Sequence, residues 1–541
     1  MAAAIATDFL ATDREFTTPH HDLSTRLSSW SPVRKDMADP TVIPLAVLNG
    51  TSCIGCHKDA CGQSTRYVPA LGLVGGCPHS TDIRGFHSEI SGLDAALVQR
   101  LYLQMLDGAA TTQLETDATR EVFFRMRHAW NIVRLTNPQA EWYGDVCPAF
   151  CQHACIAGIP ADADGIHKPI GIRLTEKFIT EFAFAAGWVV LDTSQPYSGR
   201  EVAIIGSGPA GLAAGQLLAE AGHRVTIYER DPWFGGLLSK RGIPSFHLGK
   251  DIVARRIALM EKHPQIQFLN STDVGKTVGL DELRSRFDWV IIACGAQQPR
   301  QHEMLNGLSL GNVAHALDYL VDPMRFNTQG QGVYVLGGGF SSLDVLGSEA
   351  RKRVQAGEHS DAIELLNIVR RGRPEDLKVP HWQVEDARLG LVRYDELLRD
   401  PLWNTSIQQV IHNAGRLQSL VLRNSTTGTE STVDVGHLFL ALGFTGPEQY
   451  MIDAFRGVQT ASSGGSVLFR PVDEFNRTSH DRVSVCGDAM LAASTVVQAA
   501  AEGYRTAWAV NLLLGGSEYR WLKQPYGVTC LPGVHTKFAR K

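Results

Sequence analysis

The sequence predicts an α/β protein in which an α-helical, cysteine-rich domain precedes two doubly wound Rossmann-like domains. Three observations predict this architecture. Seven of the ten cysteines lie between Cys53 and Cys155, a strand–glycine turn–helix pattern begins at residue 201, and a second copy of that pattern begins at residue 331. Strands that alternate with helices in this way are typical of parallel sheets covered by helices.

Length, charge and hydropathy exclude several classes of protein. A chain of 541 residues allows roughly three or four domains. The net charge of −5 is ordinary for an enzyme and gives no support to a nucleic-acid partner. The first residues, "MAAAIATDFLATDREF", lack a basic region followed by an apolar core, and no long apolar run predicts a membrane span. We therefore expect a cytoplasmic protein.

Composition and periodicity divide the chain into segments. Residues 1–45 are polar and are expected to form an N-terminal arm, whereas residues 46–190 are expected to form the helical domain. In "GIRLTEKFITEFAFAAGW", Leu174, Phe178 and Phe182 recur at helical spacing. The polar stretch "DTSQPYSGR" (192–200) is typical of a linker. The remaining predicted segments are a first doubly wound domain (198–330 and 465–515), a second one (331–464) and a C-terminal tail (516–541).

The clustered cysteines are more typical of metal ligands than of disulfides. Cys53, Cys56 and Cys61 fall within nine residues. Disulfide frameworks belong to small secreted domains, and this chain has no visible secretory signal. Zinc and iron–sulfur sites both remain open on spacing alone. The isolated Cys294 and Cys486 are expected to be core residues, as small apolar side chains.

The first glycine turn lies in "EVAIIGSGPAGLAAGQLLAEAGHRVTIYER" (201–230). Gly206 permits the tight turn, Gly208 lets the backbone approach a pyrophosphate, and Gly211 lets the helix pack on the strand. A pyrophosphate is stabilised by the free N–H groups and the dipole at the helix N-terminus. Glu229 ends the second strand, where a ribose-binding carboxylate is expected. This segment therefore predicts a dinucleotide site.

The second glycine turn lies in "QGVYVLGGGFSSLDVLGSEARKR" (331–353), where Gly337, Gly339 and Ser342 occupy the three positions. The strand that follows, in "AIELLNIVRRGR", ends in Arg370 and Arg371 instead of an acidic residue. Arginines suit the 2′-phosphate of NADP, whereas a carboxylate suits the 2′-hydroxyl of NAD. A solvated basic loop is the alternative, and NADP(H) is the favoured interpretation.

Two further segments predict that the second domain is inserted into the first. "DWVIIACGAQQPR" (288–300) is a strand that ends at Gly295, and "RVSVCGDAMLAASTVVQAAAEGYRTAW" (482–508) is a strand, a Gly-Asp pair and a helix. In flavoproteins with two dinucleotide sites, a Gly-Asp at a strand end commonly places the aspartate on flavin ribityl oxygens. Gly487 and Asp488 therefore return to the first domain late in the chain, unless this dipeptide is a simple turn.

Several independent motifs together resemble one family. They are Cys53-x2-Cys56-x4-Cys61, Cys77-Pro78, "LTNPQAEWYGDVCPAFCQHAC" (135–155), "GSGPAGLAA", "ACGAQQPR", "VLGGGFSSLD", "ALGFTGPE" (441–448) and "CGDAM". Over residues 46–515 the chain resembles the small subunit of glutamate synthase. It is also similar to the N-terminal part of dihydropyrimidine dehydrogenase and to the large subunit of NADH-dependent ferredoxin:NADP oxidoreductase.

The resemblance implies FAD and NAD(P)H domains and two [4Fe–4S] clusters in the helical domain. Carried over by position, the ligands of the first cluster are Cys53, Cys56, Cys61 and Cys155. Those of the second are Cys77, Cys147, Cys151 and a helix residue, Glu176, for which an ordinary surface glutamate is the alternative. One departure is the fifteen-residue stretch "GQSTRYVPALGLVGG" between Cys61 and Cys77, where the family has about three residues. An insertion there is expected to loop out without changing either cluster.

The cofactor-binding candidates follow from the two glycine turns and the matching motifs, and no catalytic acid–base residue is expected. For the first domain they are Gly206, Gly208, Pro209, Ala210, Gly211, Glu229, Arg230, Gly236, Leu237, Gly295, Gly487, Asp488, Ser494, Thr495 and Val496. For the second domain they are Gly337, Gly339, Ser341, Ser342, Asp344, Arg370, Arg371 and Gly443.

The expected function is electron transfer between NADP(H), FAD and two [4Fe–4S] clusters, to or from a partner enzyme. The family implies a hetero-oligomer whose partner is a glutamate synthase large subunit or a ferredoxin-type or 2-oxoacid oxidoreductase. Two alternatives remain open at this point. One is a self-contained NADPH-dependent reductase of a small organic substrate, and the other is a non-catalytic electron-transfer scaffold.

Overall fold

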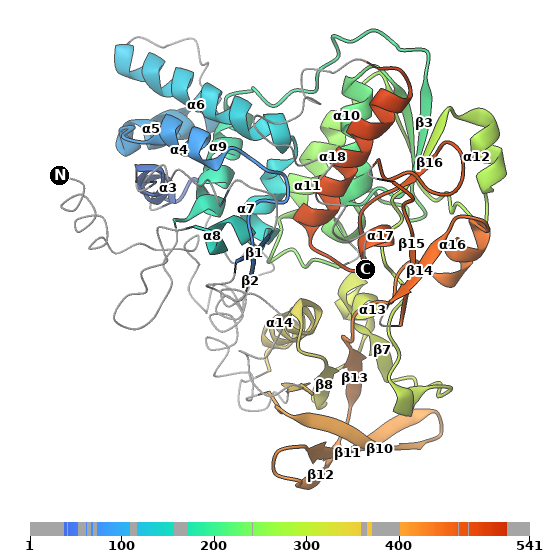
Figure 1. Cartoon of the computed structure of the whole chain (residues 1–541). Coiled ribbons are helices and arrows are strands. Elements are labelled where there is room, and N and C mark those ends of the chain that lie inside the picture. Colours follow the sequence, from blue (N-terminus) through green and yellow to red (C-terminus); the bar gives the residue numbers. More distant parts are fainter. Residues whose placement is uncertain are drawn as a thin grey trace.

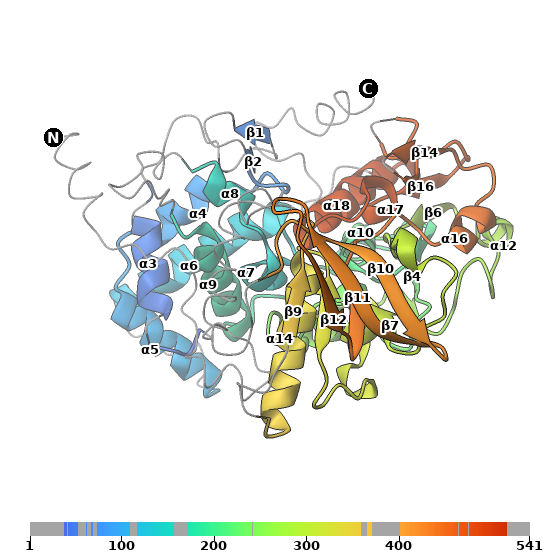
Figure 2. The same cartoon turned by 90° about the horizontal axis from the view of Figure 1, so that it is seen from below.

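The computed structural model describes residues 37–40, 42–51, 53, 61, 66–68, 73–108, 116–155, 170–240, 242–358, 365–370, 401–463, 465–473 and 475–516. Three units can be distinguished in Figures 1 and 2. The helical unit (described residues up to 190) lies beside the first dinucleotide unit (198–296 and 447–516). The second dinucleotide unit (301–442) forms the lower lobe of Figure 1. The predicted α/β class is confirmed.

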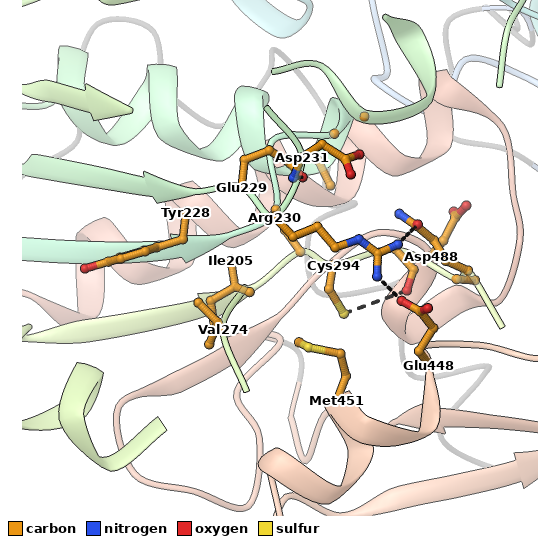
Figure 3. Close-up of a pocket in the computed structure, with 18 of the residues that line it drawn as sticks. Ile205, Tyr228, Glu229, Arg230, Asp231, Val274, Cys294, Glu448, Met451 and Asp488 are labelled. Atoms are coloured by element: carbon orange, nitrogen blue, oxygen red, sulfur yellow. Dashed lines mark hydrogen bonds and ion pairs between the residues drawn. The ribbon is translucent and has the colours of Figure 1, made fainter. Parts of the chain in front are cut away.

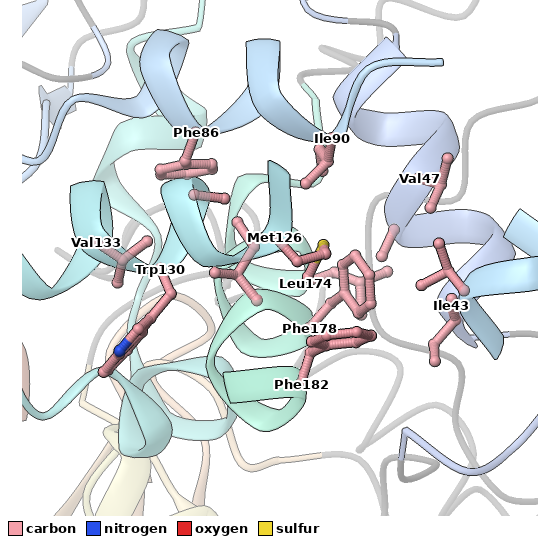
Figure 4. Close-up of a cluster of buried hydrophobic side chains, with 14 of the residues drawn as sticks. Ile43, Val47, Phe86, Ile90, Met126, Trp130, Val133, Leu174, Phe178 and Phe182 are labelled. Atoms are coloured by element: carbon pink, nitrogen blue, oxygen red, sulfur yellow. The ribbon is translucent and has the colours of Figure 1, made fainter. Parts of the chain in front are cut away.

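The helical unit packs short and medium helices around one apolar core. Phe86, Met126, Trp130 and Phe178 are buried at its centre (Figure 4). The predicted helix around Phe178 is α9, which begins at Ile172 and ends at Ala185. The helices are α3 (Val42–Thr51), α4 (Ile83–Ile90), α5 (Ala95–Leu106), α6 (Asp117–Thr136), η2 (Ala140–Trp142), α7 (Tyr143–Val146), α8 (Phe150–His153) and α9 (Ile172–Ala185).

The stretch between Cys61 and Cys77 contains a small hairpin. Strands β1 (Arg66–Val68) and β2 (Leu73–Gly75) pair in antiparallel register. The amide of Cys77 donates to the carbonyl of Cys61 across 2.9 Å, so the two ends of this stretch lie side by side. The fifteen-residue stretch therefore leaves the two cysteines adjacent.

The first dinucleotide unit contains a five-stranded parallel sheet in the order β16-β6-β3-β4-β5. The chain runs from β3 outward through β4 to β5 and then returns to β6 on the other side of β3. The strand order thus reverses between β3 and β6, which is where doubly wound sheets bind their ligands. The strands are β3 (Glu201–Ile205), β4 (Arg224–Tyr228), β5 (Ile266–Leu269), β6 (Trp289–Ile292) and β16 (Val483–Val485).

Helices cover both faces of this sheet, and α10 and α18 pack closely against each other on one face (Figure 1). Gly503 of α18 makes that approach possible, since a methyl group there would lie 2.2 Å from the carbonyl oxygen of Ala210. The helices are α10 (Pro209–Glu220), η4 (Gly236–Leu238), α11 (Lys250–Glu261), α12 (Leu280–Arg286), α16 (Gln449–Ala454), α17 (Asp488–Leu491) and α18 (Val496–Leu513). A hairpin of β14 (Thr460–Ser463) and β15 (Ser466–Phe469) lies beside them.

The second dinucleotide unit repeats the design with a parallel sheet in the order β7-β13-β8-β9. Its strands are β7 (Val313–His315), β8 (Val333–Leu336), β9 (Leu365–Ile368) and β13 (His437–Leu440). Helices α13 (Ala316–Val321) and α14 (Phe340–Gln355) and the short turns η5 (Glu303–Leu305) and η6 (Pro323–Arg325) accompany them. An antiparallel sheet of β10 (Thr405–Asn413), β11 (Arg416–Asn424) and β12 (Glu430–Asp434) extends from this unit (Figure 2).

The boundaries of the two dinucleotide units differ from the predicted ones at 330/331 and 464/465. Strand β7 pairs with β13, so the second unit begins before residue 331. Helix α16 packs its Met451 and Phe455 against the first sheet, so the first unit resumes before residue 465. Helical and strand periodicity does not reveal which sheet a short element joins, because that choice depends on contacts distant in sequence.

The chain crosses between the two dinucleotide units twice, and the two crossings pair with each other. We call residues 297–300 and 443–446 the crossing ribbon. The amide of Gln298 donates to Gly446 (3.0 Å), that of Arg300 donates to Gly443 (2.9 Å), and that of Thr445 donates to Gln298 (2.8 Å). The second unit is thus inserted into the first through a two-stranded connection.

No helix in the described part of the chain combines the length and hydropathy that a membrane span requires.

Candidate functional site

The first glycine turn lies where the strand order of the larger sheet reverses. Gly206 follows β3 and adopts a φ of +105°. A methyl group on Gly206 would lie 2.5 Å from the carbonyl oxygen of Ala293, the residue that follows β6. Only glycine allows the two strand ends to approach this closely. The turn therefore opens directly into the crevice between β3 and β6.

Gly208 and Gly211 serve different purposes in this turn. Gly208 is the N-cap of α10 and supplies no side-chain cap, so amides of the first turn remain available to an anion. A methyl group on Gly208 would meet no protein atom within 4 Å. A methyl group on Gly211 would lie 2.0 Å from the carbonyl oxygen of Gly206. Gly208 thus faces open space, whereas Gly211 faces the packed contact between helix and turn.

A pocket extends from this turn along the carboxyl ends of the strands (Figure 3). It brings together segments from β3, β4, β6, α16 and α17, which are distant in sequence. Most of the candidates predicted for this unit line it, namely Gly206, Gly208, Pro209, Ala210, Glu229, Arg230, Gly236, Leu237, Gly295 and Asp488. Further lining residues that the sequence did not identify are Ile205, Tyr228, Asp231, Thr272, Asp273, Val274, Cys294, Gln297, Glu448, Tyr450 and Met451.

Glu229 is held in a fixed orientation at the end of β4. Its carboxylate accepts from the amide of Ser207 (3.0 Å), the hydroxyl of Ser207 (2.6 Å) and the amide of Asp231 (3.0 Å). These hydrogen bonds link the end of β4 to the glycine turn. The carboxylate is thereby placed beside the turn, where a ribose hydroxyl is expected to donate.

Arg230 spans the pocket and contacts the returning segment of the first unit. Its guanidinium forms an ion pair with Glu448, bonds to Gln297 and donates to the Tyr450 hydroxyl across 3.3 Å (Figure 3). Tyr450 in turn donates to Asp273 across 2.8 Å. Glu448 lies in the motif "ALGFTGPE". No local sequence pattern indicates that it contacts Arg230, which is 218 positions away.

Asp488 and Ala499 of α18 line another end of the pocket. Burial raises the pKa of Asp488 to about 6, and the Ser494 hydroxyl donates to its carboxylate. Among the described residues no cation forms an ion pair with this carboxylate, so it is suited to accept from hydroxyl groups of a ligand. Thr495 caps α18 through a reciprocal contact with Gln498, and Val496 is the first residue of that helix.

The two isolated cysteines of this unit lie in different environments. Cys486 is completely buried, so its prediction as a core residue is confirmed. Cys294 is partly buried and packs against the apolar core, but it also lines the pocket, so its prediction as a core residue is only partly confirmed. Burial raises the pKa of the Cys294 thiol to about 12. Cys294 is thus a neutral thiol at physiological pH and is not activated as a nucleophile.

The second glycine turn has the same placement in the smaller sheet. Gly337 follows β8 with a φ of +140°, and a methyl group there would lie 2.3 Å from the carbonyl oxygen of Ala441, which follows β13. Gly339 is the N-cap of α14, and a methyl group on it would meet nothing within 4 Å. Ser342, in the third position, is buried and donates to the carbonyl of Gly339 across 2.5 Å. Both units therefore present an uncapped helix N-terminus at their switch points.

The other candidates of the second unit are dispersed around this turn. Ser341 is partly buried, whereas Gly443 is exposed in the crossing ribbon. Arg370 is exposed just beyond β9, and Arg371 lies outside the described residues. Asp344 is buried on α14, and its Oδ1 lies 2.9 Å from His247 Nε2 of the first unit. Asp344 therefore contacts the first dinucleotide unit.

The cysteines of the helical unit converge at its boundary with the first dinucleotide unit. Cys61, Cys147, Cys151 and Cys155 are buried, and Cys53 and Cys77 are partly buried. The amide of Gly76 donates to the carbonyl of Phe150 across 2.9 Å, which places Cys77 beside the turn that carries Cys147 and Cys151. Of the predicted ligands, Cys56 lies outside the described residues.

The turn between Cys147 and Cys151 has an unusual backbone. Ala149 lies in the left-handed region, with φ 55° and ψ 47°, although it has a side chain. Its amide donates to the sulfur of Cys147 across 3.3 Å. Left-handed non-glycine residues cost about 1 kcal/mol or more and cluster at functional sites. Burial, and then the charge of Cys147, raise the pKa of Cys151, so the two sulfur atoms lie near each other.

Glu176 of α9 faces the same region as Cys77 and Cys147. Burial raises the pKa of Glu176 to about 7, while a hydrogen bond from Asn137 (2.9 Å) opposes that shift. Burial, and then the charge of Glu176, raise the pKa values of Cys77 and Cys147. Within the described residues, however, no group of three or more potential ligands has the geometry that holds a single metal ion.

The chain is similar to a protein family and to individual proteins of known name. Residues 200–503 match the family described as pyridine nucleotide-disulphide oxidoreductase. The "Glutamate synthase [NADPH] small chain" of Bacillus subtilis is 30% identical over 424 residues, which are 73% of this chain and 82% of that protein. The protein of the same name from Mycobacterium tuberculosis strain H37Rv is 30% identical and covers 73% and 82%.

A longer fungal protein also matches. The "Glutamate synthase [NADH]" of Schizosaccharomyces pombe is 34% identical over 420 residues, which are 71% of this chain. The matched region is only 19% of that protein's length. The chain thus corresponds to about one fifth of the fungal protein and to most of the bacterial small chains.

Proposed function

This chain belongs to the glutamate synthase small-chain family of NAD(P)H-dependent flavin oxidoreductases, and on that premise we propose that it moves electrons from NADPH through FAD to two [4Fe–4S] clusters and on to a partner enzyme. The resemblance found in the sequence motifs is confirmed by these relatives. We propose the specific nucleotide, the clusters and the partner on separate grounds. Residues of the chain support the nucleotide and the clusters, and the relatives support the partner.

The pocket of the first dinucleotide unit has features that suit FAD. Gly208 leaves open space at the N-terminus of α10, where the pyrophosphate would lie, and Glu229 is held beside the turn, where it could accept from a ribose hydroxyl. Asp488 is a buried carboxylate suited to the ribityl hydroxyls. When bound there, FAD accepts two electrons as hydride and releases them singly. The protein's own task is to hold the flavin and to exclude water from it.

The second dinucleotide unit has features that suit NADPH. Gly339 leaves open space at the N-terminus of α14, as Gly208 does at α10. Arg370 is exposed beyond β9 and is available to a 2′-phosphate, and Arg371 follows it in the sequence. When bound, NADPH supplies the hydride. Arg370, Arg371 and the amides of α14 would then hold the nucleotide.

The cysteines of the helical unit suit iron–sulfur clusters better than single ions. Cys77, Cys147, Cys151 and Glu176 would hold one cluster, and Cys53, Cys56, Cys61 and Cys155 the other. The mutual electrostatic effects of Cys77, Cys147, Cys151 and Glu176 support a shared site for this set. In a [4Fe–4S] cluster each of the four iron atoms would bind its own ligand, so a set of three cysteines and one carboxylate would suit it. Bound clusters pass electrons one at a time.

One observation carries the proposal of electron transfer between the units. Cys147 and Phe150 belong to the same apolar cluster as Ala210 of α10 and Ala499 of α18. Ala210 and Ala499 also line the pocket of the first dinucleotide unit. A continuous, closely packed interior therefore connects a predicted cluster ligand with the flavin pocket. The set that contains Cys147 and Glu176 would receive electrons first.

The partner is proposed from the relatives. Two of them are named as small chains of glutamate synthase, and a third is a longer glutamate synthase in which the matched region is a minor part. We propose that this chain likewise supplies electrons to a separate catalytic chain, a glutamate synthase large subunit or a ferredoxin-type or 2-oxoacid oxidoreductase. The residues that line its own pocket suit a cofactor, so the partner would carry the substrate site.

Purification from the native host without overproduction tests this proposal. A large catalytic chain that co-elutes in fixed ratio is the expected result, together with NADPH-dependent activity on that chain's substrate. If the protein elutes alone and oxidises NADPH with a small organic substrate, it is a self-contained reductase and the subunit proposal is wrong. If it elutes alone with no bound flavin, the electron-transfer proposal is wrong as well.

A further inference from the structure

A second contact joins the two dinucleotide units away from the crossing ribbon. His247 follows the flavin-pocket residues Gly236 and Leu237 by about ten positions in the first unit, and Asp344 lies on α14 of the second unit. His247 Nε2 and Asp344 Oδ1 are 2.9 Å apart, within hydrogen-bond distance. The side chain of Asp344 is 12% exposed and that of His247 is 42% exposed. The carboxylate is therefore committed to this contact.

Phe246 adds an apolar component to the same contact. It is buried, and the guanidinium of Arg351, about two turns along α14 from Asp344, lies 3.8 Å from the centre of its ring. Such cation–π contacts are stabilising by about 0.5–2 kcal/mol, more when they are desolvated as here. Phe246 thus contacts Arg351, and the adjacent His247 contacts Asp344.

The segment that carries these residues is itself fixed to the flavin pocket. Lys250 donates to the carbonyls of Leu238 (2.8 Å) and Ile243 (2.5 Å), which closes the segment between η4 and α11. Burial lowers the pKa of Lys250 to about 8, an effect that the nearby charge of Asp344 opposes. A displacement of α14 would therefore be transmitted through this segment to Gly236 and Leu237 at the flavin pocket.

The two-stranded crossing ribbon does not by itself fix the orientation of the second unit. Two adjacent strands form a narrow connection about which a unit can rotate, whereas a contact at a distance from that connection prevents rotation. The pairs His247–Asp344 and Phe246–Arg351 supply such a contact on α14, the helix whose N-terminus forms the second glycine turn. The orientation of that turn thus depends on them.

We propose that His247 and Asp344 are positioning residues: their contact sets the rotation of the second dinucleotide unit about the crossing ribbon, and hence the alignment of NADPH with the flavin. This inference rests on the proposed function. In the step that it governs, NADPH loses a hydride to become NADP⁺ and the oxidised flavin gains that hydride. Misplacement of reacting groups by about 1 Å can reduce such a rate by about a hundredfold.

The test measures flavin reduction by NADPH in the anaerobic holoenzyme by stopped-flow absorbance. For His247→Ala and Asp344→Asn, the limiting rate is expected to fall on the order of tenfold, with the Kd for NADPH and the flavin content unchanged. His247→Gln retains an N–H donor at this position and should restore most of the rate. The double variant should be no slower than the slower single variant, because both remove one contact.

The control is His128→Ala, which removes a histidine–carboxylate pair of equal length inside the helical unit: His128 Nδ1 lies 2.9 Å from Glu89 Oε1. Its limiting rate should equal that of the unaltered protein. If His247→Ala behaves like this control, the inference is wrong. If Asp344→Asn instead raises the Kd at an unchanged limiting rate, Asp344 binds the nucleotide and the inference is also wrong. If dithionite but not NADPH reduces the flavin of the unaltered protein, the proposed function is wrong.

Discussion

Arg256 and Glu141 form a buried, two-pronged ion pair between the first dinucleotide unit and the helical unit. Arg256 Nε lies 2.5 Å from Glu141 Oε1 and Nη2 lies 2.9 Å from Oε2. Both side chains are at most 1% exposed. A third bond joins Arg256 Nη1 to Gln216 Oε1 across 3.2 Å. This pair connects the predicted cluster-binding unit with the flavin-binding unit.

Removing one partner of this pair should destabilise the protein strongly. Arg256→Met leaves the Glu141 charge buried without its counterion, which should lower the free energy of unfolding by about 3–5 kcal/mol. The double variant Arg256→Met/Glu141→Leu should recover much of that loss. Arg286→Met is the control, since its pair with Glu282 is exposed and contributes at most about 1 kcal/mol. Equal losses in urea unfolding for both single variants would contradict the account.

Gly208→Ala should weaken flavin binding, whereas Gly211→Ala should weaken the fold itself. The methyl group on Gly208 meets no protein atom but occupies the space expected for the pyrophosphate, so bound FAD should decrease while the apoprotein unfolds normally. The methyl group on Gly211 would lie 2.0 Å from a backbone oxygen, so the fold itself should be destabilised. Flavin absorbance and thermal unfolding separate the two effects. Normal flavin content in Gly208→Ala would contradict the placement of the pyrophosphate.

Glu220 predicts a dependence of stability on pH. Burial raises its pKa from 4.5 to about 7, although Arg134 and the amide of Asp192 oppose that shift. The folded protein therefore binds this proton more tightly than the unfolded chain, and the contribution of Glu220 to stability falls as the pH rises from 4.5 to about 7. The total loss is about 3 kcal/mol.

Glu220→Gln removes this titration and should therefore stabilise the protein more at about pH 8 than at about pH 5. The difference in unfolding free energy between the variant and the unaltered protein, measured at both pH values, checks this expectation. Glu282→Gln, which alters an exposed carboxylate, should show little difference between them. A gain of equal size at both pH values would show that Glu220 is ionised in the folded protein throughout.

The arginines after β9 should determine the choice of nucleotide. Replacing Arg370 and Arg371 by alanine removes charge-assisted hydrogen bonds to a 2′-phosphate, each with a cost of about 1.5–3 kcal/mol. The KM for NADPH should rise and that for NADH should change little. Arg423→Ala, an exposed arginine of β11, serves as the control. If the unaltered enzyme already prefers NADH, the assignment of NADP(H) is wrong.

Local features of the fold could be predicted because their causes lie within a few residues. The turns at Gly206 and Gly337 require positive φ angles and close backbone approach, and only glycine permits both. Helix α9 shows its apolar face in the spacing of Leu174, Phe178 and Phe182. These patterns depend on the chain's local geometry alone.

Features that join distant segments could not be predicted in the same way. Arg230 meets Glu448 across 218 positions, and His247 meets Asp344 between two units. Strand β7 has three residues, too few to show a period, and it joins the second sheet although it precedes residue 331. Such pairings follow from how the units pack, which leaves no trace in local composition.

Metal and flavin analysis of anaerobically purified protein tests the central claim most directly. Two [4Fe–4S] clusters held by the seven clustered cysteines and Glu176 predict about eight iron atoms and an equal amount of acid-labile sulfide for each bound FAD. A value near four would mean that one of the two sets binds no cluster. Zinc in place of iron, or flavin with no metal at all, would contradict the claim that this chain carries electrons from NADPH through its helical unit.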